Sequence, residues 1–185
     1  MKRIFSVITL LLFVFVGAAQ SQQLTINKND SQLTVFGTSN IHDWEIIAES
    51  MSGSLTPIWV DNKLKSLEKL TFKIPVESLK SGKSGMDKNT YVALKSDKYP
   101  NIKFNLQSTK ITGNDITVTG TLEIAGTKKT VTFPVKYSVS GGNIVISGSY
   151  KMKMTDYKVE PPTALFGSIT TGNDLTIKFN IQFKK

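Results

Sequence analysis

Apolar and polar residues alternate along the chain between residues 101 and 154, and no 3.6-residue period competes with this pattern. An alternation of period two predicts β-strands that bury one face and expose the other. Glycines at Gly113, Gly126 and Gly141 interrupt it and supply the positive-φ residues of tight hairpin turns. The region therefore predicts an antiparallel meander, with the apolar positions Ile102, Phe104, Leu106, Ile116, Val118, Leu122, Ile124, Val131, Phe133, Val135, Tyr137, Ile144, Ile146, Tyr150, Met152 and Met154.

Further strands are predicted on both sides of this meander. Residues 24–26 and 32–38 predict a first hairpin, and further inward-facing sets are His42, Trp44, Ile46 and Ala48, then Leu70, Phe72, Ile74 and Val76, and finally Leu175, Ile177, Phe179, Ile181 and Phe183. In addition, Leu67 is out of phase with Leu70, which predicts a β-bulge. The total is about eight strands, and their apolar faces must be covered by closing the sheet into a barrel or by stacking a second sheet.

One segment has a different period and one has none. Between Ser81 and Lys98 the residues Met86, Thr90, Ala93 and Leu94 share a helical stripe, which predicts a short helix over about 85–95, with Ser84 and Asp87 as a capping box. Residues 155–172 form the longest aperiodic stretch, and loops of this length are often lids. Because Leu165 and Phe166 are apolar, we expect this loop to pack on the barrel. The predicted fold is an all-β antiparallel barrel with one short helix and a long lid loop.

The first residues have the order of a secretory signal peptide. Lys2 and Arg3 precede an apolar run from Ile4 to Val16, and small residues follow up to Ala19. The run is shorter than the roughly 20 residues that span a bilayer. We therefore expect residues 1–19 to be cleaved, residues 20–185 to form one domain, and the protein to be exported, either to a periplasm or as a secreted protein.

Composition narrows the partners. The chain carries a net charge of +9, which becomes +7 without Lys2 and Arg3, and the remaining basic residues are all lysines. Nucleic-acid-binding proteins favour arginine, so no nucleic-acid partner is expected. A weak attraction to an anionic membrane surface is expected. Five lysines cluster around the predicted helix and form either an ordinary solvated surface or a cationic mouth for an anionic head group, namely Lys80, Lys83, Lys88, Lys95 and Lys98.

The residues give little support to catalysis. The chain has no cysteine and a single histidine, so neither a thiolate site nor a zinc site made of several histidines is expected. A nucleophilic site would depend on His42, whose neighbour Asp43 faces the other side of the strand. A hydrolytic carboxylate pair, Asp43 and Glu45, falls on the face predicted to be wet. We therefore expect no enzyme, no metal and no cofactor.

Several motifs resemble those of one family. The segment 86–104, with Met86-Asp87-Lys88-Asn89, Ala93-Leu94-Lys95-Ser96 and Lys98-Tyr99-Pro100-Asn101-Ile102-Lys103-Phe104, is similar to the short helix and the following strand of YceI-like proteins. Residues 115–133 resemble that family's next hairpin. The resemblance implies a lipocalin-like barrel that is exported and binds a polyisoprenoid or related lipid in its interior. Many members carry Lys-His-x-Gly where this chain has Asn40-Ile41-His42-Asp43-Trp44, so only inward positions are carried over, as cavity lining.

The function predicted is therefore transport or storage of a long apolar lipid. About 20 methylenes lose on the order of 16 kcal/mol in water relative to an apolar site, so such molecules need a host. The main alternative is a filled barrel or sandwich that acts as an interaction module without a ligand, and a homodimer is left open. The residues predicted to line the cavity or its mouth are His42, Trp44, Phe72, Ile74, Met86, Leu94, Ile102, Phe104, Val118, Leu122, Phe133, Val135, Tyr150, Phe166 and Ile177.

Overall fold

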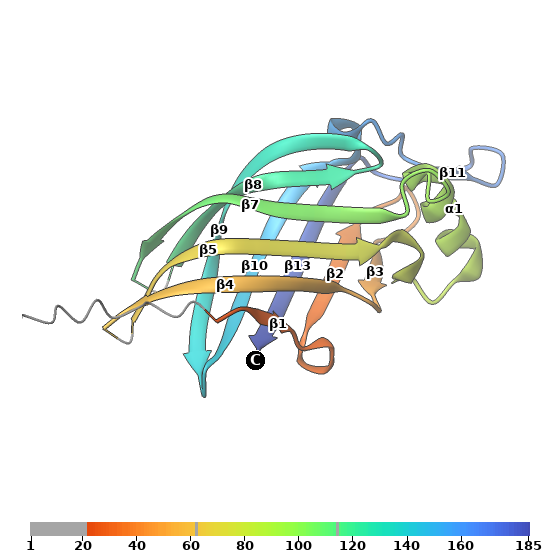
Figure 1. Cartoon of the computed structure of the whole chain (residues 1–185). Coiled ribbons are helices and arrows are strands. Elements are labelled where there is room, and N and C mark those ends of the chain that lie inside the picture. The colour runs from red at the N-terminus through yellow and green to blue at the C-terminus, as the bar shows by residue number, and fades with distance from the viewer. Residues whose placement is uncertain (1–21, 62, 114) are drawn as a thin grey trace, which may run out of the picture.

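A computed structural model describes residues 22–61, 63–113 and 115–185 of the chain (Figure 1). The predicted signal peptide, residues 1–19, lies outside the described residues. The strands are β1 (Leu24–Ile26), β2 (Gln32–Gly37), β3 (Trp44–Ala48), β4 (Ser52–Val60), β5 (Lys63–Pro75), β6 (Leu79–Lys80), β7 (Asn101–Thr112), β8 (Asp115–Ile124), β9 (Thr127–Ser140), β10 (Asn143–Lys153), β11 (Thr163–Ala164), β12 (Ile169–Thr170) and β13 (Asp174–Lys184). The helices are α1 (Ser84–Leu94) and the 3-10 turns η1 (Lys28–Asp30), η2 (Val76–Ser78) and η3 (Met154–Tyr157).

Eight strands close into an antiparallel barrel. Their order around the ring is β1, β4, β5, β7, β8, β9, β10 and β13, and β13 pairs with β1 to close it. On the edge that faces away from β10, β13 has two partners: its C-terminal end pairs with β1, while residues 176–180 pair with β2. From β2 the sheet continues through β3 to β6, which extends the wall at the end that carries α1 (Figure 1). The prediction of an antiparallel barrel of about eight strands with one short helix is confirmed.

The alternation seen in the sequence matches the two faces of the barrel wall. On β8, Ile116 and Val118 are buried and Thr117 between them is exposed. The turn after β8 holds Ala125 and Gly126 at φ 47° and 76°, the left-handed values that a tight hairpin requires. Thr56 of β4 pairs with Lys69 of β5, but the next residue, Pro57, pairs with Leu67, so the register shifts beside Leu67 and the predicted bulge is confirmed.

The helix lies across one end of the barrel and is tied to β6. The Lys80 ammonium lies 2.6 Å from the hydroxyl of Tyr91, which also lies 3.1 Å from the Leu79 carbonyl oxygen. The predicted capping box is wrong: α1 begins at Ser84, and the carboxylate of Asp87 instead accepts hydrogen bonds from the backbone N–H and the hydroxyl of Ser81 at 2.8 and 2.6 Å. These bonds lower the pKa of Asp87. Among the described residues, no helix has the length and the apolar character needed to cross a membrane.

Candidate ligand-binding cavity

The barrel encloses two adjoining chambers. The outer chamber lies beneath α1 and has a volume of about 530 Å³, and the inner chamber, deeper in the barrel, has a volume of about 160 Å³. They share the wall residues Val35, Leu79, Ile102, Ile124 and Ile177. Ligand sites in proteins commonly measure roughly 300–1,000 Å³, so the outer chamber alone falls within that range.

The inner chamber has an aromatic and aliphatic wall. The ring of Phe133 packs against those of Phe104, Tyr150 and Phe179, with centroid distances of 6.0, 5.1 and 6.2 Å. Space for the Phe104 ring depends on Gly120, where a Cβ atom would lie 2.3 Å from a ring carbon. Since no charged side chain stands among the described residues of this wall, the chamber favours hydrocarbon over any polar group.

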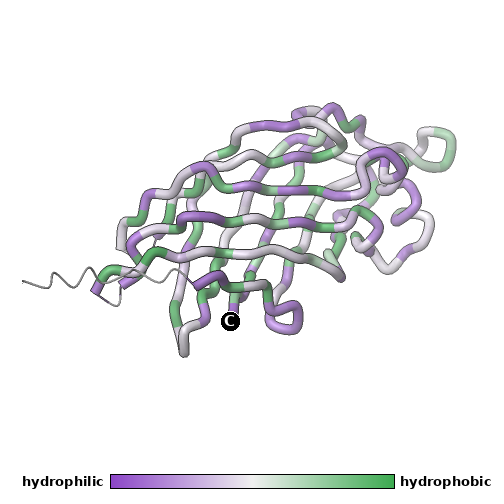
Figure 2. Tube along the Cα trace, in the orientation of Figure 1, coloured by the Kyte–Doolittle hydropathy of each residue, from purple (hydrophilic) through white to green (hydrophobic). Residues whose placement is uncertain are grey.

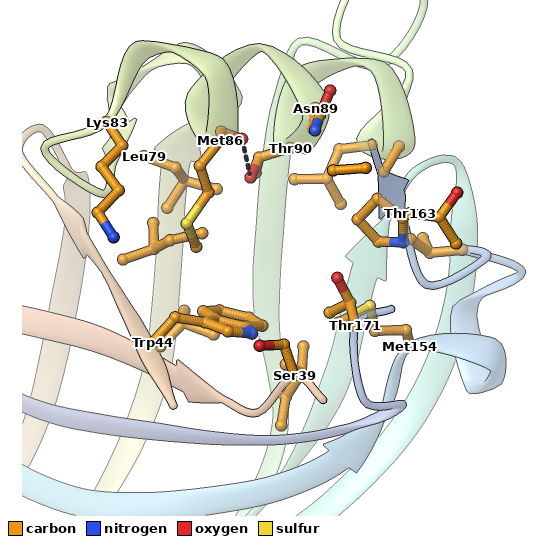
Figure 3. Close-up of a pocket in the computed structure, with 18 of the residues that line it drawn as sticks. Ser39, Trp44, Leu79, Lys83, Met86, Asn89, Thr90, Met154, Thr163 and Thr171 are labelled. Atoms are coloured by element: carbon orange, nitrogen blue, oxygen red, sulfur yellow. Dashed lines mark hydrogen bonds between the residues drawn. The ribbon is translucent and has the colours of Figure 1, made fainter. Parts of the chain in front are cut away.

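The outer chamber is apolar in its depth and polar at its rim. Figure 3 shows the Lys83 side chain directed into the pocket from the start of α1, opposite Trp44. Lys83 is the one lysine, aspartate or glutamate among the described residues of this wall. The hydroxyl of Thr90 donates to the Met86 carbonyl at 3.0 Å and is therefore already satisfied within the helix. The polar residues of the wall are Ser39, His42, Lys83, Asn89, Thr90, Thr163 and Thr171.

Trp44 forms a fixed part of this wall. Its indole N–H donates to the Thr38 carbonyl at 2.9 Å, and its ring lies against Gly37, where a Cβ atom would come within 2.1 Å. Because any larger residue at position 37 would displace the ring, the glycine and the tryptophan act as a pair. The prediction that Trp44 faces inward is confirmed, whereas its contact with a ligand stays a prediction.

The structure brings most of the predicted lining residues together. Those in the outer chamber are His42, Trp44, Met86 and Leu94; those in the inner chamber are Phe72, Ile74, Phe104, Val118, Leu122, Phe133, Val135 and Tyr150; and Ile102 and Ile177 border both. Phe166 borders neither chamber. Their role in ligand binding stays a prediction.

The prediction that the His42 side chain faces the barrel interior is wrong. The residue precedes β3 at the rim of the outer chamber, its side chain is exposed, and its Nδ1 atom lies 2.8 Å from the Asp43 carbonyl oxygen. The reason is a local turn at Ser39, whose hydroxyl donates to the His42 carbonyl at 2.7 Å and accepts from the His42 N–H at 3.1 Å. The strand phase therefore begins only at Trp44.

The expectation that Leu165 and Phe166 pack on the barrel is also wrong. Both occupy the turn between β11 and β12, at φ 49° and 53°, and their side chains are 69% and 112% exposed. What the hairpin does contribute is its base, because Thr163, Ala164 and Ile169 line the outer chamber. Strands of two residues carry no periodic signal, so the sequence indicated only a loop here.

A buried tyrosine packs beside the outer chamber. Tyr157 is 1% exposed among Ile124, Met152, Met154 and Val159, and its hydroxyl has no hydrogen-bond partner among the described residues. Burial is the main cause that raises the pKa of Tyr157 above its usual value of 10.0, and the neighbouring Tyr150 adds to it. The group is therefore neutral under ordinary conditions.

The residues that the sequence offered for chemistry lie at the rim of the cavity or outside it. They hold no group of three or more histidine, cysteine, aspartate or glutamate side chains suited to a metal ion. The hydrogen bond found for the His42 ring is to a backbone carbonyl rather than to a serine or a carboxylate. The carboxylates of Asp43 and Glu45 are exposed outside the cavity.

A closed barrel of eight antiparallel strands, with an apolar interior that opens beneath a helix at one end, defines the lipocalin-like class of fold. The chain belongs to the YceI-like family, since the family model described as YceI-like domain matches residues 24–183. The resemblance noted in the sequence is thereby confirmed.

Solved structures of the same fold come from several bacteria. BcnA of Burkholderia cenocepacia is 19% identical with a TM-score of 0.72, over 85% of this chain and 98% of that one. A polyisoprenoid binding domain of Saccharophagus degradans is 12% identical with a TM-score of 0.70, over 87% and 97%. The YceI protein of Campylobacter jejuni is 18% identical with a TM-score of 0.62, over 100% and 99%. No curated protein matches the chain.

Proposed function

We propose that this protein binds one long apolar lipid, of polyisoprenoid or fatty-acyl type, inside the barrel and transports or stores it. The observation that carries the proposal is the pair of adjoining chambers, of about 530 and 160 Å³, whose walls are apolar except at the polar rim of the outer chamber. The structural neighbour from Saccharophagus degradans, described as a polyisoprenoid binding domain, supports the same ligand class. Each methylene moved from water into such a site contributes about 0.8 kcal/mol, so affinity comes chiefly from the hydrocarbon.

The walls favour one orientation of the ligand. The described residues of the inner wall present only apolar atoms to the chamber, including those of the Tyr150 ring, whereas the rim offers an ammonium group on Lys83 and the side chains of Ser39 and Asn89. A charged head group in the inner chamber would be costly to desolvate. We therefore place the hydrocarbon tail in the inner chamber and the polar end, preferably anionic, at the rim near Lys83.

The proposed setting is an aqueous compartment outside the cytoplasm. The order of Lys2, Arg3, an apolar run and small residues up to Ala19 supports export after cleavage. A carrier in such a compartment would exchange its ligand with membranes, and the lysine-based net charge of +7 that remains after cleavage favours weak contact with anionic lipid surfaces.

The test combines identification and rebinding. Native mass spectrometry of the purified protein, followed by organic extraction, should detect one bound lipid per chain. The delipidated protein should then take up a fluorescent long-chain fatty acid or a polyisoprenoid probe at a one-to-one ratio. Protein that carries no lipid and takes up neither probe would instead be a filled interaction module.

A further inference from the structure

The most exposed apolar side chains of the described residues gather at one end of the molecule. Phe166, Val92 and Leu165 exceed the other large apolar residues in exposure, at 112%, 78% and 69%. Val92 belongs to α1, and the other two form the tip of the β11–β12 hairpin, at the same end of the barrel (Figure 1). Figure 2 shows this tip as a hydrophobic segment that projects away from the barrel. Contiguous exposed apolar groups on a folded protein commonly mark an interaction site.

The conformation of the tip adds to the cost of this exposure. Leu165 and Phe166 have φ values of 49° and 53°, in the left-handed region that bulky side chains rarely adopt, and Gly167 follows at 89°. The backbone thus holds two large apolar side chains outward in a strained turn. Strained residues of this kind concentrate at functional positions.

The tip is attached firmly to the cavity mouth. The side-chain amide of Asn40 donates to the Ser168 carbonyl at 2.9 Å and accepts from the Thr170 N–H at 3.0 Å, and its backbone N–H donates to the Thr170 carbonyl at 3.1 Å. The neighbouring Ile41, which is 57% exposed, lines the outer chamber itself. A surface that binds the tip of the β11–β12 hairpin would therefore lie against the mouth of the outer chamber.

Charge near the mouth favours an anionic surface. Lys83 lines the outer chamber, and exposed lysines follow on α1 and just beyond it at Lys88, Lys95 and Lys98. Lysines close to an anionic bilayer are attracted to it, an effect that falls off within a Debye length. Apolar side chains beside such lysines are the combination that peripheral membrane proteins use to dock.

We propose that Leu165, Phe166 and Ile41 insert into the surface of an anionic lipid bilayer and hold the cavity mouth against it, so that the lipid ligand passes between bilayer and barrel without crossing water. The proposal rests on the proposed function for the identity of the cargo. The docking itself depends only on the exposed tip and the neighbouring lysines.

The test compares two pairs of exposed apolar residues. The variant L165S/F166S changes the tip, and the control V60S/V139S removes apolar residues that are 50% and 43% exposed near the hairpin turns at the opposite end of the barrel. Sedimentation with vesicles of phosphatidylcholine and phosphatidylglycerol should show binding of the wild type and the control. The tip variant should bind at least tenfold more weakly, and 0.5 M salt should weaken the binding of the wild type.

A second measurement separates docking from ligand binding. The rate of transfer of a fluorescent fatty acid from labelled vesicles should fall at least tenfold in the tip variant, while equilibrium binding of the same probe added from ethanol stays unchanged. If no variant binds the probe but vesicle binding still depends on the tip, the proposed function fails and the docking stands. Wild-type protein that does not bind vesicles, or a tip variant that binds them equally well, would overturn the docking and leave the tip as a surface for a protein partner.

Discussion

Replacing Val118 by phenylalanine tests whether the inner chamber is empty space or tightly packed core. Val118 is 4% exposed, lines the inner chamber and pairs with Phe133 of the neighbouring strand. Phenylalanine adds four carbon atoms and no hydrogen atoms, which together occupy roughly 50 Å³, less than two water molecules at ~30 Å³ each. A chamber of about 160 Å³ can accommodate this increase.

The magnitude follows from the filled volume. At about 24 cal/mol per Å³, filling roughly 50 Å³ of void would stabilise the ligand-free protein by up to ~1.2 kcal/mol, from which some rotamer strain must be subtracted. The same volume excludes about two methylenes of the ligand tail, if each takes slightly less than the ~30 Å³ of a water molecule. At about 0.8 kcal/mol per methylene, ligand affinity should fall by ~1.6 kcal/mol, which is on the order of fifteenfold.

The assay is urea unfolding of delipidated wild-type and V118F protein, together with titration of a fluorescent fatty acid. We expect V118F to be at least as stable as the wild type and to bind the probe about fifteenfold more weakly. The control T117F adds a ring to the exposed face of the same strand and should change neither quantity appreciably. In a filled core, V118F would lower the free energy of unfolding by about 1–3 kcal/mol through overpacking. A loss of that size in V118F, together with a wild type that carries no lipid, would refute the cavity.

Three further substitutions test other parts of the site. V135K places an ammonium in the apolar inner chamber and should abolish folding or ligand uptake, whereas K136A on the outer face should affect neither, as circular dichroism and titration would show. K83Q should weaken binding of a fatty acid about fivefold but leave the matching alcohol unchanged, with K88Q as control. Burial raises the pKa of Tyr157 in the folded protein above 10.0. The free energy of unfolding should therefore not depend on this group below pH 10, and it should decrease as the pH rises from 10 toward the pKa of the folded state, because the unfolded chain then ionises first. Y157F should reduce this alkaline loss in unfolding curves without lowering stability at pH 7, since it removes an unpartnered hydroxyl.

The sequence predicted those parts of the fold that depend on local period and turn chemistry. Long strands such as β8 alternate cleanly because one face is buried along the whole length, and the turn at Gly126 needs residues that tolerate positive φ. The bulge at Leu67 was visible because an apolar residue fell out of phase. The helix was predicted within one residue at each end, although its capping partner was not, because the Asp87 carboxylate reaches back to Ser81.

The site could be predicted only in part. Alternation identified the inward residues, but it cannot distinguish a cavity from a packed core, because the same residues line both. His42 was misplaced because the turn at Ser39 resets the strand phase, and such a turn leaves no mark in a hydrophobic pattern. The contribution of β11 and β12 to the wall was missed because each has only two residues. Whether the Phe166 side chain packs on the barrel or points into solvent is decided by the backbone conformation of the turn between β11 and β12, and the amino-acid composition of the loop does not reveal that conformation.

The pairing of β13 with three other strands has a consequence for the order of folding. This strand, residues 174–184, is the neighbour that β1, β2 and β10 share, and the partners Thr25 and Lys184 are separated by almost the whole domain. The ring therefore cannot close before residues 24–184 are all available for pairing, and pairings between such distant residues form slowly. Until β13 is in place, the barrel stays open along the edge between β1 and β10.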